Sequence, residues 1–107
     1  MANPTNVNWV DPTANVDGSP LAAGEITGYE VGVRASSGTA GTYTSTANVP
    51  ATVTTCALSA LSPALPNGGT FAVAVRALAA TDSAWSTEAD FTLVPPAPLP
   101  PTAVSVV

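Results

Sequence analysis

The sequence predicts an all-β fold, a sandwich of two sheets, from three observations. Short stretches rich in Val, Thr and aromatic residues recur along the chain and alternate between apolar and polar side chains. Clusters of Gly, Pro, Asn, Asp and Ser separate these stretches, as expected for turns between strands. No stretch carries an apolar stripe of helical period bounded by caps. With 107 residues, the chain is long enough to bury one core and too short for two.

The alternation is clearest over residues 26–34 and 70–78. In both stretches one face is apolar and is expected to point into the core, while the other face is small or polar. The predicted inward side chains are Tyr29, Val31 and Val33 in the first stretch and Phe71, Val73, Val75 and Ala77 in the second, where Ala72, Ala74 and Arg76 are predicted to point outward. Further strands are predicted at residues 7–10, 43–47, 52–58 and 85–93.

The composition changes after Leu93. Residues 95–101 are mostly proline and favour extended polyproline II, which is stiff and cannot enter the interior of a sheet. The segment beyond them is rich in β-branched residues and is predicted to be a strand. The chain therefore divides into a sandwich over residues 1–94 and a proline-rich linker with a C-terminal donor strand over residues 95–107, the donor residues being Thr102, Ala103, Val104, Ser105, Val106 and Val107.

The charge and composition argue against several functional classes. Seven acidic residues stand against two basic ones, so the chain lacks the cationic cluster that nucleic-acid binding needs. His is absent and Cys56, predicted to be buried, is the one cysteine, which excludes an internal disulfide and the usual zinc ligand sets. No enzyme motif is present. We therefore predict no cofactor, no metal, no nucleic-acid partner and no enzymatic activity.

The N-terminus lacks the basic and apolar regions of a signal peptide, and no apolar run is long enough for a membrane span. We therefore expect synthesis in the cytoplasm and no membrane partner.

Several polar and aromatic residues are candidates for ligand binding. Trp9 and Trp85 could stack on a ligand, although a tryptophan on a strand is more typical of a core. Asp11, Asn15 and Asp17 share one loop, but they lack the pattern of a calcium loop and are better explained as turn formers.

The two arginines are predicted to point outward from neighbouring strands. Arg76 is placed to pair with Glu30 across these strands, which would support the strand register. Alternatively, Arg34 and Arg76, together with Trp85, contact a partner protein.

A series of short motifs follows a set order between residues 7 and 93: Val7-x-Trp9, Asp17-Gly18-Ser19-Pro20, Ile26-x-Gly28-Tyr29-Glu30-Val31, Leu58-x-x-Leu61-x-Pro63, Val73-x-Val75-Arg76-Ala77 and Ser83-x-Trp85-Ser86. Taken together, they resemble a fibronectin type III domain, an immunoglobulin-like sandwich. The resemblance implies that Trp9 lies on strand B, Tyr29 on strand C, Leu61 at the corner between strands E and F, and Phe71 at the start of strand F. Family members usually carry tyrosine at the place of Phe71, so this corner is expected to depend on packing alone.

The chain departs from this family at its N-terminus, where too few residues precede Trp9 to form strand A. Without strand A, the strand that carries Val7 and Trp9 keeps an unpaired edge, which is a template for strand addition. Residues 100–107 look like a strand A displaced to the other end of the chain. Val7 and Trp9 are therefore the predicted acceptor edge for a donated strand.

The displaced strand is predicted to insert into a neighbouring copy. The linker of residues 95–101 reaches roughly 22 Å at about 3.1 Å per residue, while the strand that it would have to cross spans roughly 25 Å. A return to its own sandwich would also require a reversal, which prolines resist. Repeated insertion from copy to copy gives a ring or a filament.

These features favour a non-enzymatic structural protein that assembles with itself. Charged residues make up only 8% of the chain, Lys is absent, and small outward residues permit close subunit packing. Short single-domain proteins of this type are similar to accessory proteins of bacteriophage virions, so we expect a virion protein, for capsid decoration or for the tail surface, that contacts other virion structural proteins. The alternatives are a subunit of an extracellular surface filament built by strand donation and a monomeric carbohydrate- or receptor-binding module.

Overall fold

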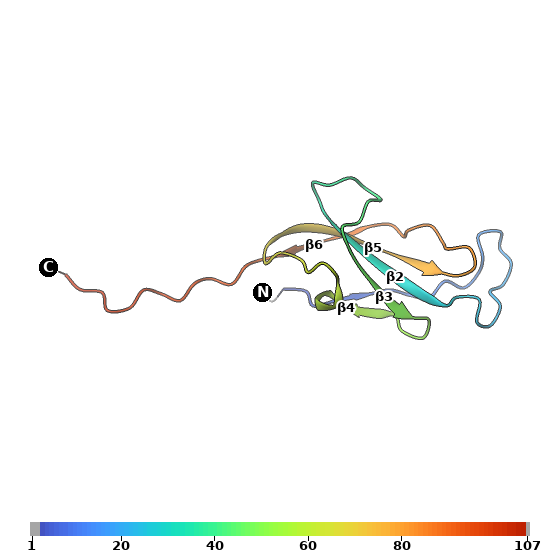
Figure 1. The fold of residues 1–107 in the computed structure, drawn as a ribbon, viewed down its shortest axis with the longest axis horizontal. Coiled ribbons are helices and arrows are strands. Elements are labelled where there is room, and N and C mark those ends of the chain that lie inside the picture. The colour runs from blue at the N-terminus through green and yellow to red at the C-terminus, as the bar shows by residue number, and fades with distance from the viewer. Residues whose placement is uncertain (1–2, 107) are drawn as a thin grey trace.

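The computed structural model describes residues 3–106 as an all-β structure with two antiparallel sheets (Figure 1). The larger sheet has the strand order β3-β2-β5-β6, and the smaller one pairs β1 with β4. The predicted two-sheet, all-β architecture is confirmed. The strands are β1 (Asn6–Asn8), β2 (Gly28–Ala35), β3 (Ser45–Pro50), β4 (Thr55–Ala57), β5 (Gly69–Leu78) and β6 (Ala89–Leu93), and a short 3₁₀ turn, η1 (Leu58–Ala60), follows β4.

Strands β2 and β5 form the centre of the larger sheet because their alternating apolar side chains fit a pleated, half-buried surface. Their register places Val31 opposite Val75 and Val33 opposite Val73. Both Val31 and Val33 are completely buried, as the alternation predicted. Each fully buried side chain of this size stabilises the fold by about 1.5–3 kcal/mol.

The core lies between the two sheets. Its buried members are Val31, Val33, Cys56, Leu61, Phe71 and Val73, and partly buried side chains from β1, β3 and β6 pack around them. Phe71 stacks on Phe91 of β6 with ring centroids 5.3 Å apart, so packing supports this part of β5, where no tyrosine hydroxyl is available. Cys56 is buried, as predicted, and burial raises the pKa of its thiol.

Four strands differ in their bounds from the prediction, among them β3, which covers Ser45–Pro50 instead of residues 43–47. The last strand begins at Ala89, and residues 85–88 lie in the preceding loop. In that loop the hydroxyls of Ser83 and Ser86 accept hydrogen bonds from the N–H groups of Ala77 and Val75, at 2.8 and 3.0 Å. The N–H groups of the same serines donate to the carbonyls of Ala77 and Val75, both at 2.9 Å, so the loop pairs with the end of β5 through backbone and side chains together. The first strand is Asn6–Asn8 rather than residues 7–10, and β4 covers only Thr55–Ala57 because η1 starts at Leu58.

Ala72 and Ala74 lie on the outer face of the larger sheet, as predicted, but this face is not open to solvent. They are only 1% and 2% exposed. Tyr43 lies against Gly32, which is opposite Ala74 in the register, so the outer face of the larger sheet is covered by its own chain. A side chain of the same molecule packs on these small outward residues. Their small size therefore does not indicate close packing between subunits.

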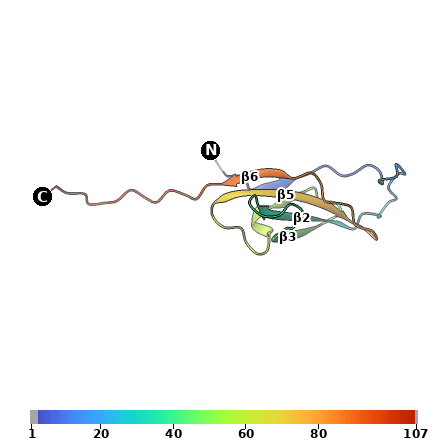
Figure 2. The ribbon, with the colours of Figure 1, turned by 90° about the horizontal axis from the view of Figure 1, so that it is seen from above.

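The segment after β6 leaves the body and does not return to it (Figure 2). Every residue from Val94 to Val106 is exposed, and Val104 and Val106 are 83% and 99% exposed. The predicted strand over residues 102–107 is absent over residues 102–106, where Ala103 has a φ of 56° that interrupts an extended run. A strand needs a neighbouring ladder, and the proline linker holds this segment away from both edges of its own body. Val107 lies outside the described residues.

Candidate functional site

Strand β1 has one paired edge and one free edge. Towards β4, the N–H of Trp9 donates to the carbonyl of Thr54 at 3.0 Å, and the carbonyl of Thr5 accepts from Leu58 at 2.8 Å. Residues that exchange hydrogen bonds alternate along an antiparallel strand. The backbone groups of Asn6, Asn8 and Val10 therefore face away from β4, and no hydrogen bond from another residue in the described range 3–106 reaches them.

Strand β6 has a matching free edge. It pairs with β5 on one side, with Phe71 opposite Phe91. Its other edge faces the N-terminal segment, since the amide of Asn3 bonds to both the N–H and the carbonyl of Val94, each at 3.0 Å. Because backbone orientation alternates, Asp90 and Thr92 face the same way as Val94. The Asn3–Val94 bonds close one end of the space between the two segments.

Beyond a cavity of about 320 Å³ at this closed end, which Asn3, Pro4, Leu93 and Val94 line, two shallow cavities follow one another along the space. The first, of about 210 Å³, lies between residues 6–8 and 89–91, and Leu58 and Val73 of the core also line it. The second, of about 230 Å³, lies between Trp9 and residues 83–86, and Tyr29 and Val75 line it. We call the space between residues 3–12 and residues 83–94 the β1–β6 seam. At the seam, apolar core side chains are accessible beside two rows of unpaired backbone groups.

The predicted acceptor residues, Val7 and Trp9, both lie on this seam and also pack against the core. The indole N–H of Trp9 is buried and has no hydrogen-bond partner among the described residues, which is a costly state for a buried donor. Beside it, at a ring-centroid distance of 5.4 Å, Tyr29 donates its hydroxyl to Asp11. Burial, together with this hydrogen bond, raises the pKa of Tyr29 to about 12.

The predicted donor residues do not occupy the seam of their own chain. Residues 102–106 lie far from it, at the end of an extended tail that gives the molecule a length of 78 Å against widths of 27 and 22 Å (Figure 1). The seam is an apolar cleft with unpaired strand edges, and the tail is an exposed β-branched segment. These two complementary features lie apart within one chain.

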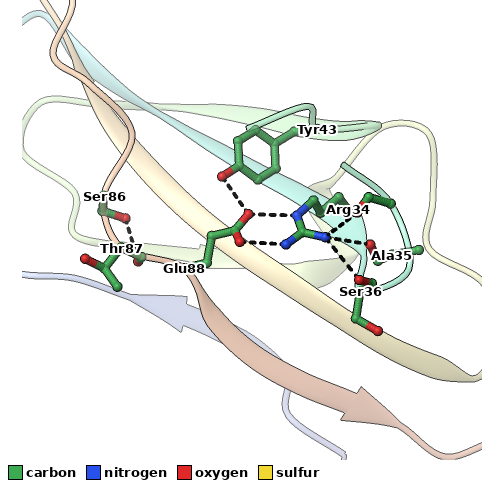
Figure 3. Close-up of polar contacts among 8 residues, drawn as sticks. Arg34, Ala35, Ser36, Tyr43, Ser86, Thr87 and Glu88 are labelled. Carbon is green, nitrogen blue, oxygen red and sulfur yellow. Dashed lines mark hydrogen bonds and ion pairs between the residues drawn. The ribbon is translucent and has the colours of Figure 1, made fainter. Parts of the chain in front are cut away.

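A second cluster covers the outer face of the larger sheet (Figure 3). The guanidinium of Arg34 makes two parallel contacts with the carboxylate of Glu88, at 2.7 and 2.8 Å. It also donates to the carbonyl of Ala35 at the end of β2 and to two carbonyls of the loop that follows. The hydroxyl of Tyr43 donates to the same carboxylate at 2.9 Å. The Arg34 hydrogen bond lowers the pKa of Glu88 to about 2.

Arg76 and Trp85 belong to the same face. The predicted pair of Arg76 with Glu30 is confirmed, since the residues are opposite in the register and their side chains lie 2.6 Å apart. The guanidinium of Arg76 also lies 4.9 Å from the ring centroid of Trp85, which packs at 4.5 Å on Tyr43. The structure therefore gives Arg34, Arg76 and Trp85 intramolecular partners, and contact with another protein stays a prediction.

The loop between β1 and β2 forms a turn through its polar side chains. The carboxylate of Asp17 accepts hydrogen bonds from the N–H and hydroxyl of Ser19, at 2.9 and 2.6 Å, and Asn15 bonds to the same hydroxyl. These bonds lower the pKa of Asp17 and fit the predicted role of these residues in turn formation. Within residues 3–106 no group of three or more acidic, His or Cys side chains could hold a metal ion.

Comparison of the chain with protein-family models, with curated proteins and with solved structures finds no match. Over the described part of the chain, no helix is long and apolar enough to cross a membrane. Any statement about function therefore depends on the geometry of the chain itself.

Sequence reasoning found one side of the seam and missed the other. The absence of strand A pointed to the free edge of β1, whereas β6 was not predicted to form the opposite wall. The signal that could have indicated it is the Pro-rich stretch directly after Leu93, which ends β6 and leaves no following strand to cover its edge.

Proposed function

We propose that this protein is a structural subunit that assembles with copies of itself by donating its C-terminal segment into the β1–β6 seam of a neighbour. One observation carries the proposal: the sandwich has apolar cavities beside the free edges of β1 and β6, and the same chain carries an exposed β-branched segment on a stiff linker. Insertion would pair the free backbone groups of β1 and bury apolar side chains on both sides of the contact.

The same proposal includes the fold family. The order of strands in the two sheets supports a fibronectin type III-like sandwich that lacks strand A, with β1 as strand B, β4 as strand E, and β3, β2, β5 and β6 as strands C′, C, F and G. The incoming segment would then occupy the position of strand A beside strand B.

Within this proposal, the subunit belongs to a bacteriophage virion, as a capsid decoration or tail-surface protein. The support is indirect: both arginines are paired with glutamates on one face, and a small sandwich of this kind can coat a repeating lattice through many modest contacts. A filament on a cell or virion surface is the second candidate, because the tail prolongs the long axis of the body (Figure 1).

Removal of residues 102–107 tests the proposal. We expect the intact protein to form oligomers or polymers in size-exclusion chromatography with light scattering, and the truncated protein to be a folded monomer with a lower melting temperature. Electron microscopy then separates the candidates, since filaments support the second and discrete oligomers support the first. An intact protein that stays monomeric at all concentrations, or truncation that leaves assembly unchanged, contradicts strand donation.

A further inference from the structure

The two ends of the seam differ, and this difference sets the direction of an incoming chain. The bonds between Asn3 and Val94 close the end from which the tail of the same molecule departs. At the opposite end, the seam continues past Trp9 to Pro12 and Ser83. In Figure 1 the loop that follows β1 lies at the end of the body away from the tail.

From these positions we infer that the donated segment enters at the open end, runs antiparallel to β1, and places Val104 opposite Trp9 and Val106 opposite Val7. This inference depends on the proposed function and specifies its direction and register. A neighbour that follows in a similar orientation, in a ring or in a filament, presents its open end to the departing tail. The segment then runs down the seam without a reversal of the proline linker.

The two faces of the tail determine which side chains enter the seam. Directly opposite residues of an antiparallel pair point to the same side of the sheet. Val7 and Trp9 point towards the core, so their partners must be the apolar residues of the tail, Val104 and Val106. The residues between them, Ala103 and Ser105, then face outward.

The register of the donated segment against β1 follows from the two cavities beside Val7 and Trp9 and from the end that the Asn3–Val94 bonds close. With Val106 opposite Val7 and Val104 opposite Trp9, each of the two cavities receives one valine. A shift of two residues towards the closed end would leave the Trp9 cavity without a valine and drive the end of the chain towards Asn3. The backbone groups of Ser105 and Ala103 then meet those of Asn8 and Val10, which are the free groups of β1.

Disulfide trapping tests the register. In a Cys56→Ala background, Asn8→Cys with Ser105→Cys places two cysteines opposite each other at a Cα distance of about 5.5 Å, within disulfide range. Asn6→Cys with Ser105→Cys is the control for a two-residue shift. We expect a ladder of linked chains on a non-reducing gel for the first pair and only traces for the second. The same first product should form between two separate chains that carry one cysteine each.

Aspartate substitutions test which face enters the seam. Val104→Asp and Val106→Asp should each weaken assembly by about a hundredfold or more, because they bury a charge without a partner. Ser105→Asp and Ala103→Asp, which introduce the same charge on the outward face, should change it by less than about threefold.

Each outcome separates this inference from the proposed function. If linkage is stronger for the Asn6 pair, or if outward and inward aspartates act alike, the register or the face is wrong while strand donation stands. A disulfide within a single chain overturns insertion into a neighbour. A protein that does not assemble at all overturns the proposed function and this inference together.

Discussion

The polar groups on the outer face of the larger sheet have partners, whereas those on the free strand edges at the β1–β6 seam do not. On the outer face, Arg34, Glu88 and Tyr43 satisfy one another, and Arg76 pairs with Glu30. At the seam, the backbone groups on the free edges of β1 and β6 and the indole N–H of Trp9 have no partner in the described chain. A surface whose charges are already paired gains little from a new neighbour, whereas an unpaired strand edge beside apolar side chains gains both hydrogen bonds and burial. Binding potential in this molecule therefore lies with its backbone edges and not with its charges.

The largest effect on assembly is expected when the free edge of β1 is blocked. Asn8→Pro removes an N–H that faces the seam and is not used by β4, and proline is tolerated at such an edge position. We expect assembly to be lost, while the free energy of unfolding of the body falls by only about 1 kcal/mol, for the lost hydrogen bond from Thr55. Sedimentation and urea unfolding measure the two effects.

Asn8→Ala is the matched control, since it removes the same amide side chain but keeps the N–H. It should assemble as the natural protein does. If Asn8→Pro also assembles normally, the donated strand does not pair with β1.

A larger side chain at Gly32 tests whether Tyr43 covers the outer face of the larger sheet. A Cβ at Gly32 would lie only 2.6 Å from Cγ of Tyr43. Gly32→Ala should therefore reduce the free energy of unfolding by about 1–3 kcal/mol through overpacking, with no direct effect on the seam. In a Tyr43→Ala background the same substitution should cost much less. Equal costs in both backgrounds, measured by urea unfolding, would show that Tyr43 does not cover Gly32.

The smallest effect is expected from Glu88→Gln, and it should depend on pH. The pKa of Glu88 falls from its usual 4.5 to about 2 in the folded protein, so the folded state favours the ionised carboxylate. This contribution is fully present above pH 4.5 and is lost as the pH falls towards 2. The melting temperature of Glu88→Gln should lie below that of the natural protein at pH 6, and the two should converge near pH 2. A constant difference across this range would contradict the ion pair with Arg34.

The alternation of apolar and polar side chains predicted those features of the fold that are set within a single strand. Alternation placed Val31 and Val33 in the core, and it brought Glu30 and Arg76 to neighbouring positions. It did not predict the burial of Ala72 and Ala74 on the outer face, because the cover of this face, such as Tyr43 against Gly32 opposite Ala74, comes from other segments of the chain. Glu88 escaped notice for the same reason, since its partner Arg34 lies 54 residues away.

By itself, the sequence determined the all-β class, the inward faces of the central strands, and the proline-rich segment that separates the tail from the body. These follow from side-chain period and from the fixed backbone of proline, which act over a few residues. Only the tertiary structure decided that β1 and β6 border a common cleft, that one end of this cleft is closed by Asn3, and that the small outer residues are covered within the chain. Such features depend on the packing of segments far apart in the sequence, and no periodicity within one segment encodes where another will lie.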